Sequence, residues 1–268
     1  MQALAKEVYQ NNWPKFIIVL TIFIFTSCGN LKDATYFNDV PQNYEFNAPV
    51  GVSEIKANDL LGISVNSINP EASEMFNLSL QSTFETTTAS GQLSKLSGYL
   101  VDTEGYLKIP VLGSIKVAGM TKLELEDFLE KELVRRELLV EPSVKIRNLN
   151  FKVSVLGEVN SPTVITVPNE KISILEALAR AGDITIDGNK KDVLLMRELE
   201  KDGYGKFMVR IDLTSDDILE SPYYFLRSND VIYVKPTKNK VDANTAAIRW
   251  IPVILSSLSL AILVITTR

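Results

Sequence analysis

Two helix-start signals of the same type constrain the fold of this chain more than any other feature of its sequence. Thr121 and Glu124 have the spacing of a capping box, in which each side chain accepts the backbone N–H of the other residue. Ser173 and Glu176 repeat this spacing. Each pair precedes a short segment whose apolar residues recur at helical spacing. Segments with the pattern of β-strands lie before and after it. The sequence therefore predicts two small domains that each lay a helix across a sheet.

The first domain is expected over residues 51–149. Its helix carries one apolar stripe, formed by Leu125, Phe128, Leu129 and Leu133. Residues 61–65 alternate as a half-buried strand does, and residues 98–115 combine apolar alternations with glycine and proline turns. The stretch 66–97 is rich in Ser, Thr and Asn, and we interpret it as an insertion.

The second domain is expected over residues 150–236. Its helix begins at Ser173 and ends near Gly182, because glycine commonly follows the last turn of a helix. Strand-like runs occupy residues 152–156, 164–167, 193–196, 207–211 and 231–234. One helix among several short strands predicts an α+β domain with the helix across a mixed sheet.

The N-terminus has the pattern of an export signal. An apolar run over residues 16–25 follows two lysines and is too short to cross a bilayer core of about 30 Å. Small residues then lead to Cys28, the position of the acylated cysteine in a bacterial lipobox, although Phe25 stands where an aliphatic residue is typical. We expect residues 1–27 to be a lipoprotein signal peptide and Cys28 to be lipidated. The alternative is an incidental thiol after a conventional signal peptide.

The segments on either side of the two domains differ in character. Residues 28–50 are polar and turn-prone, which predicts a tether or extended arm. At the other end, residues 237–247 read as a linker before a helix over 248–268. Residues 250–267 carry no charge, and as a helix they would be about 27 Å long, which suits the thin outer membrane.

Helical spacing divides this C-terminal segment into two faces. The predicted lipid face consists of Trp250, Ile251, Leu255, Leu258, Ile262 and Ile265. The other face, which could line a lumen or contact neighbouring helices, consists of Arg249, Ser256, Ser259 and Thr267. The alternative is a plain hydrophobic anchor whose serines bond backbone carbonyls one turn back.

Composition argues against several classes of function. The chain has no histidine and a single cysteine, so it lacks the commonest general base and cannot build a cysteine zinc site. We expect no catalytic residue, no metal site and no cofactor. With 28 basic and 33 acidic residues the net charge is -5, and no basic run predicts a nucleic-acid partner. A carboxylate pair such as Asp102 and Glu104 would be needed for a glycan-modifying enzyme.

These residues resemble the polysaccharide export family of outer-membrane lipoproteins. The first domain carries the resemblance in Ile55, Lys56, Asp59, Leu61, Ile63 and Val65, in the block 98–119 with Thr121 and Glu124, and in Pro142, Val144 and Ile146. The second resembles that family's soluble-ligand-binding β-grasp module in Val155, Gly157, Glu158, Val159 and Pro162, in Glu176, Ala177, Ala181 and Gly182, and in residues 230–234. Asn58 and Thr163 replace usual glycines, and Ser228-Asn229 replaces a usual Pro-Gly.

The resemblance implies a fold and a function. The expected fold class is α+β, with two small mixed α/β periplasmic domains followed by a C-terminal transmembrane α-helix. The implied function is passive export of a capsule or exopolysaccharide through a homo-oligomeric ring, with an octamer as the family's pattern. The implied partners are other copies of the chain, an inner-membrane copolymerase with its tyrosine kinase, the polysaccharide substrate and outer-membrane lipid.

Two rival functions remain at this point. A membrane-anchored periplasmic lipoprotein could bind a soluble saccharide through its β-grasp domain and use the C-terminus only as an anchor. A glycan-modifying enzyme could use the Asp102 and Glu104 carboxylates. Because a protein lipidated at Cys28 needs no second membrane element, the C-terminal segment favours the exporter.

Overall fold

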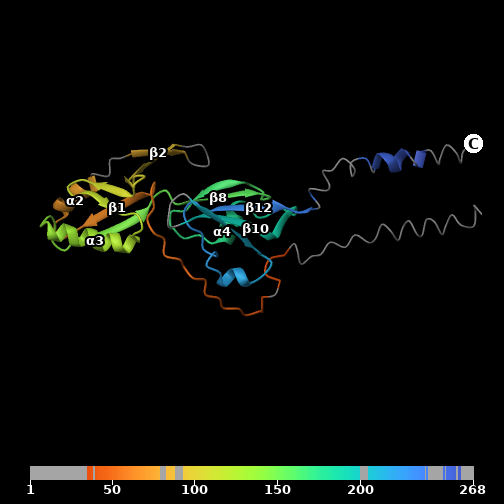
Figure 1. Cartoon of the computed structure of the whole chain (residues 1–268), viewed down its shortest axis with the longest axis horizontal. Helices are drawn as coiled ribbons and strands as arrows, with labels where there is room; N and C mark the ends of the chain where they lie inside the picture. Colours follow the sequence, from red (N-terminus) through yellow and green to blue (C-terminus); the bar gives the residue numbers. More distant parts are fainter. Residues whose placement is uncertain are drawn as a thin grey trace, which may run out of the picture. The chain divides into compact units, whose positions relative to one another are not determined.

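A computed structural model describes residues 35–38, 40–78, 83–87, 93–199, 205–238, 240, 250, 252–257 and 259–260. Residues 1–35 form a separate unit, and the description below concerns the unit over Tyr36–Arg268. The described chain contains two small mixed α/β domains (Figure 1), which confirms the predicted pair. They are called the first domain (residues 51–149) and the second domain (residues 150–236).

The first domain is built around a three-stranded antiparallel sheet in the order β4-β1-β7. Its strands are β1 (Leu60–Asn66), β4 (Tyr99–Leu100) and β7 (Ser143–Asn148). The remaining elements are α2 (Pro70–Leu78), the hairpin of β2 (Thr83–Thr87) with β3 (Leu93–Ser97), the hairpin of β5 (Tyr106–Ile109) with β6 (Gly113–Lys116), and α3 (Lys122–Arg135). Helix α3 lies against β7.

Helix α3 begins with the predicted capping box. The Glu124 N–H donates to Thr121 Oγ1 at 3.2 Å, and the Thr121 N–H donates to Glu124 Oε2 at 2.7 Å. Leu125, Leu129 and Leu133 are at most 1% exposed. Phe128 is 37% exposed, so the buried stripe is narrower than predicted, because this residue lies at its margin.

The outer edge of β7 is covered by carboxylates rather than by another strand. Backbone N–H groups of alternate residues Val144, Ile146 and Asn148 donate to Glu130, Glu126 and Glu170, each at 2.8 Å. We call these three glutamates the acceptor row. Since an unpaired strand edge invites pairing with another chain, the acceptor row blocks this edge. Glu126 and Glu130 belong to α3, whereas Glu170 comes from the second domain.

Part of the predicted insertion belongs to the core of the first domain. Within residues 66–97, helix α2 contributes Phe76, which is 6% exposed. The Asn77 side chain accepts the Val65 N–H at 3.0 Å and donates to the Val65 carbonyl at 2.8 Å. Asn77 therefore completes the backbone hydrogen bonding of β1 where no strand does so.

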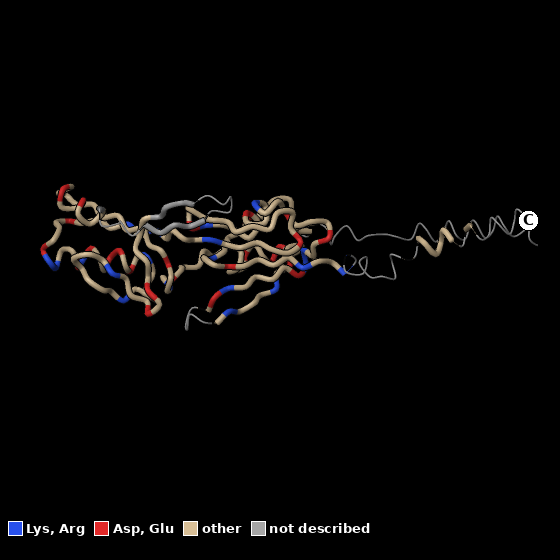
Figure 2. Tube along the Cα trace, turned by 90° about the horizontal axis from the view of Figure 1, so that it is seen from above, with Lys and Arg blue, Asp and Glu red and all other residues tan. Residues whose placement is uncertain are grey.

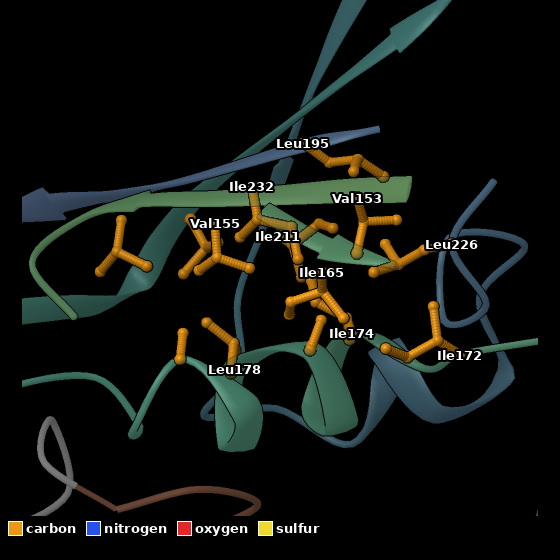
Figure 3. Packing of buried hydrophobic residues seen from close by; sticks show 14 of the residues in the cluster. Val153, Val155, Ile165, Ile172, Ile174, Leu178, Leu195, Ile211, Leu226 and Ile232 are labelled. Carbon is orange, nitrogen blue, oxygen red and sulfur yellow. The ribbon is translucent and has the colours of Figure 1, made fainter. Parts of the chain in front are cut away.

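The second domain is a five-stranded mixed sheet in the order β11-β10-β12-β8-β9, in which only β12 and β8 are parallel. The elements are β8 (Lys152–Gly157), β9 (Thr163–Thr166), α4 (Ile174–Arg180), β10 (Gly188–Glu198), β11 (Lys206–Ile211), the 3-10 helix η2 (Asp217–Glu220) and β12 (Val231–Pro236). Helix α4 lies across one face of this sheet, as predicted (Figure 3). Ile174 and Leu178 of α4 meet Val153, Val155 and Ile232 of the sheet there.

Two of the three departures from the family pattern retain the backbone conformation that glycine would adopt at that position. Asn58 has φ 67° and Asn229 has φ 65°, in the left-handed region that asparagine tolerates better than most residues. Thr163 instead begins β9, where an extended conformation requires no glycine.

The described part of the predicted arm, which contains no helix or strand, runs along the second domain (Figure 1). The Phe37 N–H donates to the Leu213 carbonyl at 3.3 Å and the Asn38 N–H to the Thr214 carbonyl at 2.9 Å. Tyr36, Phe37, Val40 and Tyr44 pack against the core of this domain. Contacts along its length therefore hold residues 36–44 to the second domain.

Charges of both signs are interspersed along the two domains (Figure 2). Asp192 illustrates how they combine, because its Oδ2 lies 2.8 Å from Arg210 Nη1 and 2.8 Å from Lys235 Nζ. These three residues belong to β10, β11 and β12, so the group ties three neighbouring strands together.

Candidate functional site

A buried ion pair anchors the loop that enters β12. Arg197 of β10 donates through Nη2 to Asp230 Oδ2 at 2.7 Å and through Nε to Asp230 Oδ1 at 3.0 Å. The two side chains are only 4% and 0% exposed. The Arg227 N–H also donates to Asp230 Oδ2, at 2.7 Å. Losing one partner of such a pair costs about 3–5 kcal/mol, because the other charge stays buried and unpaired.

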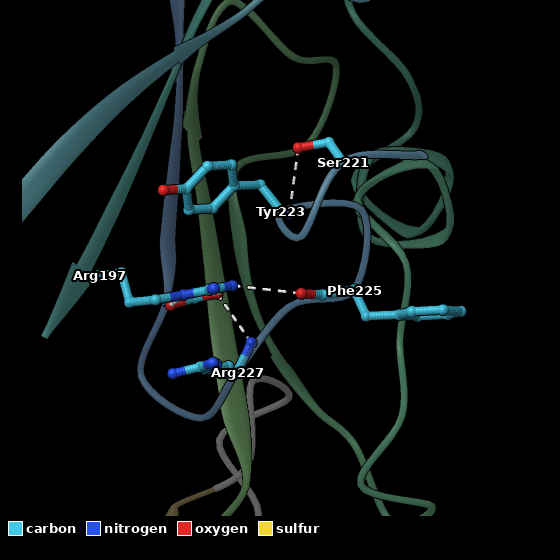
Figure 4. Close-up of polar contacts among 6 residues, drawn as sticks. Arg197, Ser221, Tyr223, Phe225 and Arg227 are labelled. Atoms are coloured by element: carbon cyan, nitrogen blue, oxygen red, sulfur yellow. Dashed lines mark hydrogen bonds and ion pairs between the residues drawn. The ribbon is translucent and has the colours of Figure 1, made fainter. Parts of the chain in front are cut away.

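Neighbouring groups enclose the Arg197 guanidinium. Its Cζ lies 5.5 Å from the centroid of the Tyr223 ring, and Nη2 donates to the Phe225 carbonyl at 3.2 Å (Figure 4). Arg227 lies on the side opposite Tyr223 (Figure 4). Burial, followed by the positive charge of Arg197, lowers the pKa of Arg227 below its usual range. These contacts hold the loop over 223–230 against Arg197 and thereby against β10.

This loop forms one wall of a cleft of about 250 Å³ between the two domains, called the junction cleft. Its lining consists of residues 50–56, Asp59, Leu61, residues 121–123, Asn148, Phe151, Glu170 and residues 227–229. Apolar side chains such as Val52 and Leu123 alternate there with charged ones. The walls of the cleft therefore combine polar and apolar side chains, which come from both domains and from the end of the arm.

Glu170 joins the two domains at this cleft. Its Oε1 accepts the Asn148 N–H at 2.8 Å, and its Oε2 pairs with Lys122 at the start of α3. The Asn150 side chain adds a link between the domains, because its Oδ1 accepts the Leu60 N–H at 2.9 Å and its Nδ2 donates to the Asn58 carbonyl at 2.9 Å. These bonds link the two domains directly.

Asp59 is the buried carboxylate of the junction cleft. It is 7% exposed, and its Oδ2 accepts the Lys56 N–H at 2.9 Å. Burial raises the pKa of Asp59 above its usual range, and the hydrogen bond from Lys56 opposes this rise. This carboxylate therefore stabilises the turn before β1, and it is not exposed to solvent as a reactive group would be.

Of the two carboxylates that an enzyme would need, that of Asp102 has a structural role in the described turn. Asp102 Oδ1 accepts the Glu104 N–H at 3.0 Å and the Tyr106 N–H at 2.8 Å. This is the bonding pattern of an aspartate that shapes a turn. Among the described residues, no group of three His, Cys, Asp or Glu side chains is placed to hold a metal ion.

The predicted membrane residues are only partly within the described chain. Cys28, Arg249, Ile251, Leu258, Ile262, Ile265 and Thr267 lie outside it. Trp250, Leu255, Ser256 and Ser259 are helical, and Trp250 and Leu255 are 60% and 64% exposed. Ser256 and Ser259 donate to the carbonyls three residues back, at 2.9 and 2.8 Å, which is the bonding of the anchor alternative. No helix among the described residues has the length and apolar character needed to cross a membrane.

Sequence reasoning missed the charged groups that organise the two domains. Arg197 interrupts an apolar strand run, and that interruption was the available signal. Glu126 and Glu130 are four residues apart on α3 beside its apolar stripe, which marks them as neighbours of the sheet. Glu170 lies in a turn and carried no such signal.

The two domains match known families in chain order. Residues 48–149 match the family described as polysaccharide biosynthesis/export protein, and residues 151–234 match the SLBB domain. The first matched segment contains α3 with its capping box, and the second contains the Arg197 and Asp230 pair.

Two relatives carry the same name, EPS I polysaccharide export outer membrane protein EpsA. The protein from Ralstonia nicotianae is 30% identical over 161 residues, which is 59% of this chain and 40% of the relative. The protein from Ralstonia solanacearum is 27% identical over 146 residues, which is 53% of this chain and 37% of the relative. The matched region thus spans less than half of either relative. With one export domain followed by one SLBB domain, the chain belongs to the polysaccharide biosynthesis/export family.

Proposed function

We propose that this chain is a subunit of an outer-membrane assembly through which polysaccharide passes toward the cell surface. The observation that carries the proposal is the ordered pair of family domains, joined through Glu170 and Asn150 into one body and followed by the uncharged segment 250–267. Both relatives are named as polysaccharide export proteins of the outer membrane.

The same proposal includes two attachments to the membrane. Cys28 follows a signal-like segment and is lipidated in this account, and the chain over 248–268 forms a helix in the outer membrane. The exposed Trp250 and Leu255 support a helix that meets lipid or other helices rather than its own domain. The bulk of the chain is then periplasmic.

A single helix cannot enclose a path, so the proposal requires several copies in a ring. In that ring the segments 248–268 stand side by side, each with its backbone hydrogen bonds satisfied internally. Eight copies is the number that the resemblance implies. Ser256 and Ser259 can still accept hydrogen bonds while donating to their own helix, so either can face a wet lumen.

The subunit acts without catalysing a reaction in this account. Asp102 and Glu104 belong to a turn, and the sequence carries no nucleotide-binding loop. The energy for transport comes from partners, which we propose to be an inner-membrane copolymerase and its tyrosine kinase.

Surface polysaccharide in a deletion strain tests the proposal. The full chain should restore surface polysaccharide, whereas a chain that ends before Ile248 should not, although its two domains retain their cores. The double substitution Asp102→Asn with Glu104→Gln is the matched control and should restore export. Full restoration by the truncated chain would favour a saccharide-capturing lipoprotein. Failure of the double substitution in a chain that unfolds as the original does would favour an enzyme.

A further inference from the structure

Two loops form a rigid end of the second domain, here called the tip. The first is the β8–β9 turn over 157–162, and the second is the α4–β10 loop over 181–188. Backbone N–H groups of Asn160, Ser161 and Thr185 donate across the two loops to the carbonyls of Asp183, Ala181 and Glu158, at 3.1, 2.8 and 3.0 Å. Loops bonded to each other in this way hold their backbones in fixed positions.

The tip presents a large apolar side chain to the outside. The Gly188 N–H donates to the Thr185 carbonyl at 2.9 Å, which closes a tight turn with Ile186 at its corner. Ile186 is 93% exposed, more than any other large hydrophobic side chain among the described residues. A Cβ at Gly188 would lie 2.3 Å from Ile184 Cγ2, so the turn depends on glycine at this position.

The chain leaves the second domain toward its C-terminus at the tip. The Thr237 N–H donates to the Asp187 carbonyl at 2.7 Å. Lys240 Nζ then lies 2.6 Å from Glu158 Oε2 and 3.7 Å from Asp187 Oδ2. Both acidic groups belong to the tip loops. The uncharged segment 250–267 therefore starts ten residues beyond a lysine that is bound to the tip.

The N-terminal arm reaches the same place from the other direction. The Tyr36 hydroxyl donates to the Asp183 carboxylate of the tip, and Lys190 Nζ lies 5.1 Å from the centroid of the Tyr36 ring. Cys28 precedes Tyr36 by eight residues, which span at most about 28 Å when fully extended. Both proposed membrane attachments thus continue from residues that are bonded to the tip.

We propose that the tip rests on the lipid headgroup surface of the outer membrane, with the Ile186 side chain inserted among the headgroups. This rests on the proposed function, because it requires the attachments at Cys28 and 248–268. A single exposed apolar residue is ordinary on a protein surface. Ile186 differs because it occupies the corner of a tight turn, on a loop that is contacted by both chain segments leading to the proposed membrane attachments. The Lys240 ammonium offsets one of the two negative charges of Glu158 and Asp187, which reduces their repulsion by anionic lipid.

Tryptophan fluorescence of the full chain in lipid tests this contact. Ile186→Trp is placed in a chain whose natural tryptophans are replaced by Trp13→Phe and Trp250→Phe, and Val140→Trp in the same background is the matched control. Val140 is 70% exposed and lies in the first domain, just before β7. The proteins are reconstituted into phosphatidylethanolamine and phosphatidylglycerol vesicles, with or without a quencher attached at shallow depth in the lipid.

The proposal predicts emission at shorter wavelength for Trp at 186 than for Trp at 140, and quenching by the shallow lipid quencher at 186 alone. Solvent-like emission at both positions would overturn it. A shorter wavelength at 186 without lipid quenching would also overturn it, because a protein surface would then cover the residue. A separate chain that carries only Trp13→Phe, and so keeps Trp250 as its single tryptophan, serves as the reference. If Trp250 shows the lipid signature and position 186 does not, the proposed attachment stands and only the tip contact is wrong.

Discussion

The two domains begin their helices in the same way but secure their sheets differently. In the second domain, the fully buried Asp230 pairs with Arg197 and positions the loop before β12. In the first domain, the acceptor row covers the edge of β7, and its members also meet partly exposed lysines such as Lys122 and Lys145. A buried charge is costly to leave without its partner, whereas the ammonium groups of these lysines remain solvated when a glutamate is removed. The second domain should therefore be the more sensitive to loss of a single charged group.

The largest effect is expected from breaking the buried pair. Arg197→Leu leaves the Asp230 carboxylate buried without its main partner, which should lower the free energy of unfolding by about 3–5 kcal/mol. Denaturant unfolding of the detergent-extracted chain measures this. Glu126→Ala in the acceptor row is the comparison, and it should cost less. An equal or larger loss from Glu126→Ala would break the contrast between the domains.

A second comparison concerns two glycines with similar backbones and different surroundings. Gly157 of the second domain has φ 96°, and an added Cβ would lie 2.1 Å from the Val234 carbonyl oxygen. Gly113 of the first domain has φ 87° with nothing within 4 Å of that position. Backbone strain of this kind costs about 1–3 kcal/mol, and Gly157→Ala adds a clash to it. Thermal unfolding should show a clearly larger loss for Gly157→Ala than for Gly113→Ala.

The two capping boxes allow a smaller and more closely matched comparison. Thr121→Ala and Ser173→Ala each remove one acceptor, and each should cost about 1 kcal/mol. Ser173 is only 4% exposed, whereas Thr121 is partly exposed, so water replaces the lost bond more easily at α3. We expect Ser173→Ala to be the more destabilising in denaturant unfolding. The reverse order would show that burial does not govern these caps.

The smallest effect is a pH dependence within the first domain. The pKa of Asp59 is raised, so between its unfolded and folded values the folded state binds more protons, and stability falls as pH rises. Asp59→Asn should remove this fall. The control is Glu132, whose pKa the hydrogen bonds from Arg135 and Arg136 lower to about 2, so that its contribution is lost as pH falls. Unfolding free energies of the original chain and of the Asp59→Asn chain, measured from pH 3 to 7, distinguish these two opposite pH dependences.

Local sequence patterns correctly predicted the two helices whose first residues form a capping box. The capping boxes at Thr121 and Ser173 specify α3 and α4, because the hydrogen bonds involved span only three residues. Helix α2 was not predicted, since its stability comes from contacts such as that of Asn77 with β1, twelve residues earlier. Tertiary contacts of this kind override a composition rich in Ser, Thr and Asn.

The candidate site was less accessible to sequence reasoning than the fold. Asp230 was recognised as part of a family motif, yet its partner Arg197 lies 33 residues away on another strand. An arginine in a strand is usually solvated, so its burial was not evident. The junction cleft depends in the same way on Glu170 of one domain meeting Asn148 of the other.

The central claim is that copies of this chain assemble around a path for polysaccharide. Electron microscopy of the full chain, extracted from membranes in mild detergent, tests it most directly. The account predicts ring-shaped particles with a central lumen, and it predicts their loss when residues 248–268 are removed. Single particles without a lumen, from a preparation that retains those residues, would contradict it.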